Sequence, residues 1–452
     1  MHQPPRVVVC GATGFIGQAL GPALAPVGAV GVGRRARPGD AAYPTYVACD
    51  LFSRDATAAA LRNADVVVYL VHSMMPAARL TQGRFEDLDL ACADNVARAA
   101  AAAGTRQIIY LGGLRPVGVT SAHLASRDEV GRALGAHGVP VTTLRAGLVI
   151  GPGGSSMEIL ARLVGRLPVM ITPRWTATRT QPVALRDVVD AIAFVVDRAD
   201  TFGRDFDLAA PEVITYRELM RITGERMGRK IRMLPVPLLT PGLSRLWLTL
   251  VTGAPRELAA PLVESLAHEM LARERTLETA MGRPMQPVRD ALEVALATTD
   301  TRSPAAFRGA RGHAPGRKVY SVQRMQLPAG RDAAWAGAEY LRWLHRLPFL
   351  RVEARADGAT SLRIAGIRSP LLVLAPARDR STPDHAVMAI VGGALAAKAI
   401  GTFEVRQVMG EGNCLTVVDA FEPRLPWWLY RITQAPLHAL VMALFRRHLR
   451  RQ

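Results

Sequence analysis

Cysteine, lysine and long apolar runs are all scarce in this sequence. The four cysteines, Cys10, Cys49, Cys92 and Cys414, are isolated, and no C-x-x-C pair occurs. The spacing therefore indicates neither a metal site nor a disulfide framework, and so few cysteines are typical of a reducing compartment. No uninterrupted apolar stretch reaches the length of about 18 residues that a membrane-spanning helix needs. No apolar leader precedes the first predicted strand, so we expect a cytoplasmic protein.

Acidic residues are few compared with basic ones. The chain has 56 lysines and arginines against 38 aspartates and glutamates, a formal net charge of +18. Residues 301–452 hold 23 basic and 10 acidic residues, or +13, and the first 300 hold the remaining 33 and 28, or +5. Such asymmetry is typical of a region that meets an anionic partner. We expect peripheral contact with the anionic inner face of a membrane rather than nucleic acid, and the alternative is a solvated surface.

The most informative segment begins with the apolar, β-branched run Val7–Cys10. Three glycines follow it in the spacing G-x-x-G-x-x-G, and a helical stretch comes next. This order predicts a dinucleotide site, because Gly11 allows a tight turn, Gly14 lets backbone approach a pyrophosphate and Gly17 lets the helix pack closely. The alternative is a tightly packed turn without a ligand. The predicted cofactor-binding residues of the turn are Gly11, Thr13, Gly14, Phe15, Ile16 and Gly17.

Two arginines follow the second predicted strand, Ala29–Gly33. An acidic residue at this point would bind the ribose 2′-hydroxyl of NAD. Arg34 and Arg35 stand there instead, and a guanidinium fork suits the 2′-phosphate of NADP. We therefore predict NADP, as NADPH, rather than NAD. The alternative is a pair of solvated arginines in an arginine-rich protein.

Residues 1–150 alternate short apolar runs with longer helical runs. This pattern predicts an α/β fold with a Rossmann-type, doubly wound parallel sheet. From about residue 150 to residue 300 the sequence is more helical, and we expect a cap that shapes a substrate pocket at the carboxyl ends of the strands. The predicted strands are Val7–Cys10, Ala29–Gly33, Thr45–Ala48, Val66–Val71, Gln107–Leu111 and Val141–Leu144, and the predicted helices are Phe85–Ala103, Ser126–Ala136, Val183–Ala199 and Thr215–Gly228.

A different pattern begins after residues 301–317, whose glycines, prolines and arginines predict a flexible basic linker. Residues 318–452 are expected to form a separate α+β domain, and residues 1–300 the NAD(P)-binding domain with its cap. The elements predicted for the second domain are strands Val319–Met325, Phe349–Arg355, Ser361–Ile367, Ala386–Ile390, Gly401–Val408 and Leu415–Phe421, and helices Asp332–Leu344 and Trp427–Leu449.

Several motifs in the first 300 residues are similar to those of the short-chain dehydrogenase/reductase superfamily. Gly11–Gly17 resembles its nucleotide motif, and Leu144–Pro152 resembles the "R-P-x-x-V-x-G-P" segment of its extended branch. Thr180–Val183 and Arg186–Val188 resemble the later "hV-x-D-V" motif. Within the superfamily the sequence is similar to atypical members, the NmrA-like and complex I accessory-subunit-like proteins. Residues 318–452 resemble helix-grip domains of the START or polyketide-cyclase type in pattern only.

The resemblance also implies cofactor contacts beyond the glycine turn. Asp50 and Leu51 correspond to a third-strand pair whose aspartate meets the adenine. Val71, His72 and Ser73 end the fourth strand, which lies beside the cofactor ribose in relatives.

The catalytic residues of the superfamily are replaced. Its serine at the end of the fifth strand corresponds to Gly112–Gly113, and its Tyr-x-x-x-Lys pair corresponds to His123 and Arg127. An imidazole, whose ordinary pKa is about 6.5, could donate the proton. Arg127 could hold the ribose hydroxyls, although a guanidinium always stays protonated. The alternative is that His123 caps a helix and that Arg127 only clamps the cofactor.

Two functions are compatible with these residues. The first is an NAD(P)H-dependent oxidoreductase that reduces a small hydrophobic carbonyl or quinone-type substrate, with His123 as the catalytic residue. The second is a non-catalytic NADPH-binding sensor or assembly module, which the missing serine and tyrosine favour.

The predicted C-terminal helix has an apolar face and a basic end. Its face consists of Leu437, Leu440, Val441, Leu444 and Phe445, at the spacing i, i+3, i+4, i+7, i+8. We expect this face either to meet a membrane or to pack on the sheet of its own domain, with the arginines at the end attracting anionic lipid.

Overall fold

The computed structural model describes residues 4–35, 37–72, 80–116, 121–167, 169–236, 264–297, 318–348, 350–410 and 412–452. The chain forms two compact units. The first consists of residues 1–75 and 95–312, and the second of residues 76–94 and 313–452. The predicted linker, residues 301–317, and Ser73 lie outside the described residues.

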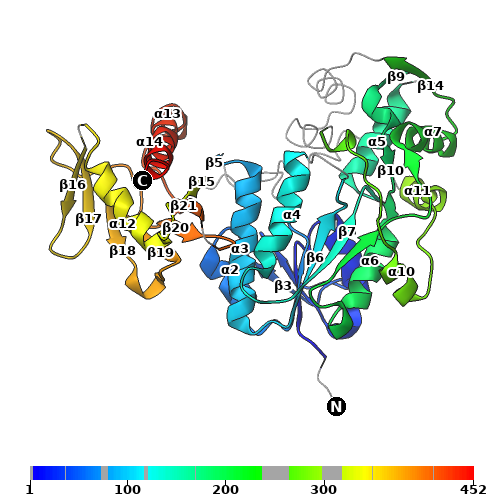
Figure 1. Cartoon of the computed structure of the whole chain (residues 1–452), viewed down its shortest axis with the longest axis horizontal. Coiled ribbons are helices and arrows are strands. Elements are labelled where there is room, and N and C mark those ends of the chain that lie inside the picture. Colours follow the sequence, from blue (N-terminus) through cyan, green and yellow to red (C-terminus); the bar gives the residue numbers. More distant parts are fainter. Residues whose placement is uncertain are drawn as a thin grey trace. The chain divides into compact units, whose positions relative to one another are not determined.

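The first unit is built on a parallel sheet of seven strands (Figure 1). The strand order is β12-β7-β6-β4-β1-β2-β3, and all neighbouring strands are parallel. The chain runs from β1 to β2 and β3 on one side and then crosses to β4 on the other, so the topological switch point lies between β1 and β4. The predicted fold class is confirmed. The strands are β1 (Val7–Cys10), β2 (Val30–Gly33), β3 (Thr45–Ala48), β4 (Val66–Tyr69), β6 (Gln107–Gly113), β7 (Val141–Ala146) and β12 (Asp205–Leu208).

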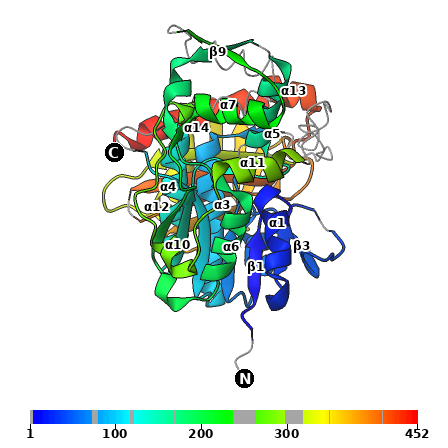
Figure 2. The ribbon, with the colours of Figure 1, turned by 90° about the vertical axis from the view of Figure 1, so that its right-hand side faces the viewer.

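Helices cover both faces of this sheet (Figures 1 and 2). On one face α1 (Phe15–Ala23) contacts α6 (Leu185–Val195), and on the other α4 (Ala122–Gly135) packs on β6 and β7. Strands β1 and β4 are apolar and buried along their whole length, as expected for strands that are covered on both sides. The sheet therefore presents only its ends to a ligand.

The region from residue 150 onward has a core of its own within the first unit. Buried Met157, Leu219 and Leu292 belong to one apolar cluster, which joins α5 (Ser155–Arg166), α7 (Tyr216–Arg226) and α11 (Val288–Ala297). The remaining elements are α2 (Arg54–Ala60) and α10 (Thr276–Met281), and the short paired strands β8 (Val149–Ile150) with β11 (Val183–Ala184), β9 (Val169–Pro173) with β14 (Arg232–Val236), and β10 (Arg179–Thr180) with β13 (Ile214–Thr215).

The second unit is an eight-stranded sheet with helices packed on it. Its order is β16-β17-β18-β19-β20-β21-β15-β5, and it is antiparallel except where β5 joins β15. Strand β18 was not predicted. The elements are β15 (Val319–Gln326), α12 (Ala333–Leu344), β16 (Leu350–Ala354), β17 (Thr360–Ile364), β18 (Leu372–Pro376), β19 (His385–Gly392), β20 (Thr402–Gln407), β21 (Asn413–Phe421), α13 (Trp427–Ile432) and α14 (Gln434–Leu449).

Strand β5 (Leu80–Gln82) reaches this sheet from the N-terminal part of the sequence. It pairs in parallel with β15, and the Gln82 side chain donates a 2.7 Å hydrogen bond to the Ala435 carbonyl. The following helix, α3 (Phe85–Ala103), belongs to the second unit up to Asp94, whose carboxylate lies 3.8 Å from the buried Arg406 guanidinium. The sequence pattern had not indicated that residues 76–94 group with the C-terminal region.

The C-terminal segment that was predicted as one helix is two helices. The chain breaks at Thr433, where α13 ends and α14 begins. Pro436 explains the break, because it has no N–H to donate to the Ile432 carbonyl one turn earlier. The predicted apolar face is also divided: Phe445 is buried, whereas Leu437 and Leu440 are exposed.

Candidate nucleotide site

The glycine-rich turn connects β1 directly to α1. Gly11 has a positive φ of 92°, and the backbone N–H of Gly14 donates to the Gly11 carbonyl at 2.9 Å. A Cβ on Gly17 would collide with the Cα of Ala12, 2.7 Å away. Gly11 and Gly17 are thus required by the turn and by the close approach of α1, as their spacing predicts.

Gly14 has a different environment. It is the N-cap of α1, it is exposed, and no side chain caps the helix. The first N–H groups of a helix have no partner within the helix, so an uncapped N-terminus offers donors and positive partial charge to an anion. A Cβ on Gly14 would meet only the Gly11 carbonyl, at 3.2 Å. The residues present fit a pyrophosphate: Thr13 and Gly14 are exposed beside the donors, while Phe15 and Ile16 are half-buried.

Arginines lie at the end of β2, as predicted. Arg34 and Arg35 directly follow Gly33 and are exposed. A third arginine, Arg37, places its guanidinium 5.4 Å from the centre of the Tyr46 ring. Arg37 was not among the predicted residues, although its place two residues after Arg35 was a usable signal. Three guanidinium groups in one short segment favour a phosphate over a ribose hydroxyl.

The end of β3 is adjacent to this segment, since β2 and β3 pair from Val30 to Gly33. Asp50 is half-buried, and one carboxylate oxygen accepts a 3.2 Å hydrogen bond from the Phe52 N–H. Leu51 is buried, and its carbonyl accepts from the Asn95 amide at 2.9 Å. The structure therefore brings the predicted adenine residues to the same edge of the sheet as the arginines.

The ends of β4 and α4 bring two histidines together. His72 follows β4, His123 lies in the first turn of α4, and their ring centres are 5.0 Å apart. Val71 and His72 are half-buried at this edge. Both histidines were predicted as site residues, but their proximity was not, because one belongs to a strand end and the other to a helix start.

Arg127 lies one helical turn after His123 and faces β6. Its guanidinium donates to the Leu111 carbonyl and stacks 5.4 Å from the centre of the Tyr110 ring. The Tyr110 hydroxyl donates back to the Arg127 carbonyl at 2.9 Å. These contacts fix α4 against β6. Gly113 has room for a side chain, since a Cβ there would meet only Leu124, at 3.7 Å.

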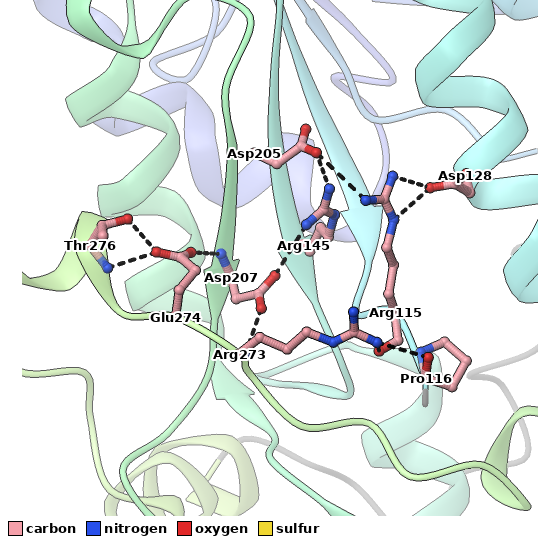
Figure 3. A network of polar contacts seen from close by, with 9 residues as sticks. All are labelled: Arg115, Pro116, Asp128, Arg145, Asp205, Asp207, Arg273, Glu274 and Thr276. Atoms are coloured by element: carbon pink, nitrogen blue, oxygen red, sulfur yellow. Dashed lines mark hydrogen bonds and ion pairs between the residues drawn. The ribbon is translucent and has the colours of Figure 1, made fainter. Parts of the chain in front are cut away.

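A charged network lies along β7 and β12 (Figure 3). The Arg145 guanidinium pairs with Asp205 and lies 3.7 Å from the Asp207 carboxylate. The Arg115 Nε donates to the Asp128 carboxylate at 2.7 Å. The second carboxylate oxygen of Asp207 accepts a 2.8 Å hydrogen bond from the backbone N–H of Arg273. A groove of about 750 Å³ runs beside α4 here and reaches Gly112 and Gly113. Three of its lining arginines, Arg115, Arg132 and Arg145, pair with aspartates.

Two residues of the later motifs hold the first unit together. The buried Gln181 amide donates to the Ala210 carbonyl at 3.2 Å and accepts from the Ala272 N–H at 2.9 Å. The buried Asp187 carboxylate pairs with Arg283 at 2.7 Å, and this pairing raises the pKa of that guanidinium. Both residues bind the segment that follows residue 264.

Thiol chemistry is not expected at the edge of the sheet. Burial, together with the neighbouring Cys49, raises the pKa of the Cys10 thiol far above its usual value. Burial also raises the pKa of Cys49 to about 11. Both thiols therefore stay protonated near neutral pH and behave as small apolar side chains. Among the residues that the structure describes, no cluster of histidines, cysteines and carboxylates could hold a metal ion.

Residues 7–209 match the model of the NAD dependent epimerase/dehydratase family. They include all seven strands of the parallel sheet. This match and the parallel sheet agree with the resemblance to NAD(P)-binding proteins of the short-chain dehydrogenase/reductase type that the motifs indicated. The helix-grip likeness of the second unit stays a prediction.

Individual proteins show the same likeness. Auxiliary protein GraX of Staphylococcus aureus is 31% identical over 142 residues, 31% of this chain and only 43% of that protein. A dTDP-6-deoxy-L-talose 4-dehydrogenase (NAD(P)(+)) of Kitasatospora kifunensis is 28% identical over 268 residues, 52% of this chain and 83% of that enzyme. The structure of an Escherichia coli NADPH-dependent quinone oxidoreductase with NADPH has a TM-score of 0.51 and 20% identity, covering 63% of this chain and 98% of that one. The last likeness shows the shared fold.

Proposed function

We propose that this protein is an NADPH-dependent reductase of a small hydrophobic carbonyl or quinone-type compound. The observation that carries the proposal is the meeting of His72 and His123 at the carboxyl edge of the sheet, with ring centres 5.0 Å apart. One histidine follows the strand that borders the switch point, and the other takes the place of the superfamily's tyrosine. A histidine at this place would supply the proton that this class of enzyme needs.

The cofactor is held by three groups of residues. The backbone N–H groups at the start of α1, beside Thr13 and Gly14, bind the pyrophosphate. Asp50 and Leu51 border the adenine, and Arg34 and Arg35 pair with the 2′-phosphate, which makes NADPH the preferred form. When bound, NADPH supplies the two reducing electrons.

The side chains of this chain then handle the substrate and its proton. Leu114, Leu124 and Met270 form a small buried apolar cluster. Leu124 directly follows His123 in the sequence, and Leu114 directly follows β6. An apolar wall of this kind favours a hydrophobic substrate and excludes water. His123 donates a proton to the substrate oxygen, and His72 orients the His123 ring by packing against it. The name of the quinone oxidoreductase neighbour supports the inclusion of quinones among the candidate substrates.

A second candidate function is a non-catalytic NADPH-binding module. It is favoured by Arg127, whose guanidinium is bound to the Leu111 carbonyl instead of being placed like the superfamily's lysine. In that case the cofactor would stabilise the fold and report its own redox state, and His123 would have no chemical role.

An assay of NADPH oxidation distinguishes the two candidate functions. Purified protein should oxidise NADPH in the presence of members of a panel of quinones, aldehydes and ketones. His123→Ala should lower kcat by about 10²–10⁴, which is typical of losing a general acid, while the Kd of NADPH stays unchanged. His137→Ala, which removes a half-buried histidine elsewhere in the same unit, is the matched control. Tight NADPH binding without turnover of any compound would favour the module, and a fully active His123→Ala variant would show that the proton comes from elsewhere.

A further inference from the structure

The two C-terminal helices leave large apolar residues exposed. The exposed fractions are 66% for Trp428, 63% for Ile432, 59% for Leu437, 55% for Leu440 and 40% for Leu444. All five lie within residues 428–444, whereas the other large apolar residues that the described part of the chain exposes are scattered over it. Scattered apolar residues need no explanation, but a contiguous group marks an interaction surface.

Helix α14 is apolar on two sides. Its inward side buries Met442, Phe445 and Leu449, and the Phe445 ring meets the Tyr340 ring of α12 edge-on at 5.0 Å. Its outward side carries Leu437 and, three and seven positions later, Leu440 and Leu444, a spacing that places them along one stripe. A helix that only covers its own core has a polar outer face. The outer face of α14 is therefore built for a second apolar environment.

Arginines without acidic neighbours in sequence surround this stripe. Residues 423–452 contain six arginines and no aspartate or glutamate. Arg447 and Arg451 continue the outward side of α14, and Arg431, Arg446 and Arg450 are exposed beside it. Within the described residues, none of these five guanidinium groups forms an ion pair with a carboxylate. The surface thus joins an apolar stripe to a dense, unbalanced positive charge.

An anionic bilayer is complementary to both features. Leucine and tryptophan side chains enter the boundary between headgroups and acyl chains, while arginine side chains extend from the helix to lipid phosphates. A second copy of this chain is less suitable, since a two-fold contact would place the same patch on both subunits and bring arginines towards arginines. Because the chain's net charge is +18, an anionic surface also attracts it from a distance.

We propose that the outward face of α13 and α14, here called the C-terminal face (Trp428, Ile432, Leu437, Leu440, Leu444 and the arginines beside them), binds the surface of an anionic phospholipid membrane. The two helices lie in the plane of the interface with their apolar stripe at the depth of the upper acyl chains. The contact is peripheral. Among the described residues, no helix is long and apolar enough to cross a bilayer.

Vesicle co-sedimentation of the full chain tests this proposal. The protein should pellet with vesicles of phosphatidylcholine and phosphatidylglycerol, and far less with phosphatidylcholine alone. Each basic residue near an anionic surface contributes about 1 kcal/mol, which is about fivefold in the partition coefficient. The change Arg447→Gln/Arg450→Gln/Arg451→Gln should therefore weaken binding by about 100-fold, and added salt should weaken binding by the native chain.

The apolar stripe is tested separately. Leu437→Gln/Leu440→Gln/Leu444→Gln should lower the partition coefficient by at least about 100-fold, since half-burying each leucine is worth roughly tenfold. Ile367→Gln/Val391→Gln, which changes two exposed apolar residues elsewhere in the second unit, should bind like the native chain. All the substituted side chains are exposed, so we expect the variants to have native melting temperatures. Thermal melts check that they are folded.

Three results would overturn the proposal. The first is no pelleting with anionic vesicles at low salt. The second is equal binding by the native chain and the triple leucine variant, which would leave only non-specific attraction by charge. The third is that the native chain is a dimer that does not bind vesicles, and that the triple leucine variant is a monomer. This result would assign the C-terminal face to a contact with a second copy of the chain. None of these outcomes depends on NADPH binding or on turnover.

Discussion

The two units of the molecule use their arginines differently. Beside β7 and β12 of the first unit, Arg145 is paired with Asp205 and Arg115 with Asp128, so that each of these arginines has a carboxylate next to it. The last 30 residues of the second unit contain six arginines and no aspartate or glutamate. Balanced charge holds a structure in one arrangement, whereas unbalanced charge on a surface favours an external anion. We therefore infer that the arginines of the last 30 residues serve to bind an anionic partner rather than to stabilise the fold.

The two candidate binding sites also differ, in how far each depends on exact backbone geometry. The glycine turn of the first unit is a rigid cradle, in which Gly17 touches Ala12 and only Gly14 is left open. The C-terminal face of the second unit is a broad apolar stripe that requires no special backbone geometry. We therefore expect the first site to fail on the addition of a single side chain, and the second to lose affinity by degrees.

The largest effect is expected at the glycine turn. Gly14→Val should abolish the NADPH-dependent rise in Tm, because the added side chain occupies the space through which the backbone meets the pyrophosphate. The variant should still melt cooperatively and bind vesicles like the native chain. Ala25→Val, which adds two methyl groups at an exposed site just beyond the C-terminal end of α1, is the control. An unchanged shift in Tm for Gly14→Val would remove the turn from the nucleotide site.

A smaller effect is expected from the arginines at the end of β2. Arg34→Ala/Arg35→Ala should weaken NADPH binding by about 10- to 100-fold, the value of a partly exposed charge-assisted contact of about 1.5–3 kcal/mol. The affinity for NADH should change little, because it has no 2′-phosphate. Calorimetric titration measures both. Arg62→Ala, at an exposed site of the same unit, should leave both affinities unchanged, and an equal loss for the two nucleotides would contradict the assignment.

The smallest effect concerns the stability of the second unit. Burial lowers the pKa of His438 to about 4, and its Nε2 lies 3.2 Å from the Ser321 hydroxyl. The unfolded chain has an ordinary imidazole and binds a proton at a higher pH than the folded one, so the free energy of unfolding falls as the pH drops from about 6.5 to 4.

Between pH 7 and pH 5 the loss from this group should be about 2 kcal/mol. His438→Gln should remove that part of the pH dependence, as measured by urea unfolding at several pH values. His345→Gln, at an exposed histidine of the same unit, should retain it. A native pH dependence in His438→Gln would show that another group is responsible.

Much of the first unit could be predicted from local pattern. The bounds of β1, β3 and α3 agree with the expected Val7–Cys10, Thr45–Ala48 and Phe85–Ala103, since each is a continuous apolar or alanine-rich run between breakers. The glycine turn was predictable for the same reason, because its strand, turn and helix are consecutive in the sequence.

The features that were missed depend on contacts between distant residues. Strand β5 has three residues, and it is a strand only because Leu80–Gln82 meet Val319–Ser321. The neighbouring positions of His72 and His123 likewise follow from the order of strands in the sheet. The break at Thr433 has a local signal in the sequence, Pro436. The regular spacing of the leucines nevertheless favoured one continuous helix.

The most direct test of the account is a calorimetric titration of the full chain with NADPH and with NADH. If the first unit is an NADPH site, NADPH binds with one site per chain and with a Kd at least about tenfold lower than that of NADH, the low end of the expected phosphate contribution. Equal affinities would contradict the role of Arg34 and Arg35. No binding of either nucleotide would contradict the central claim that the glycine turn is a cofactor site.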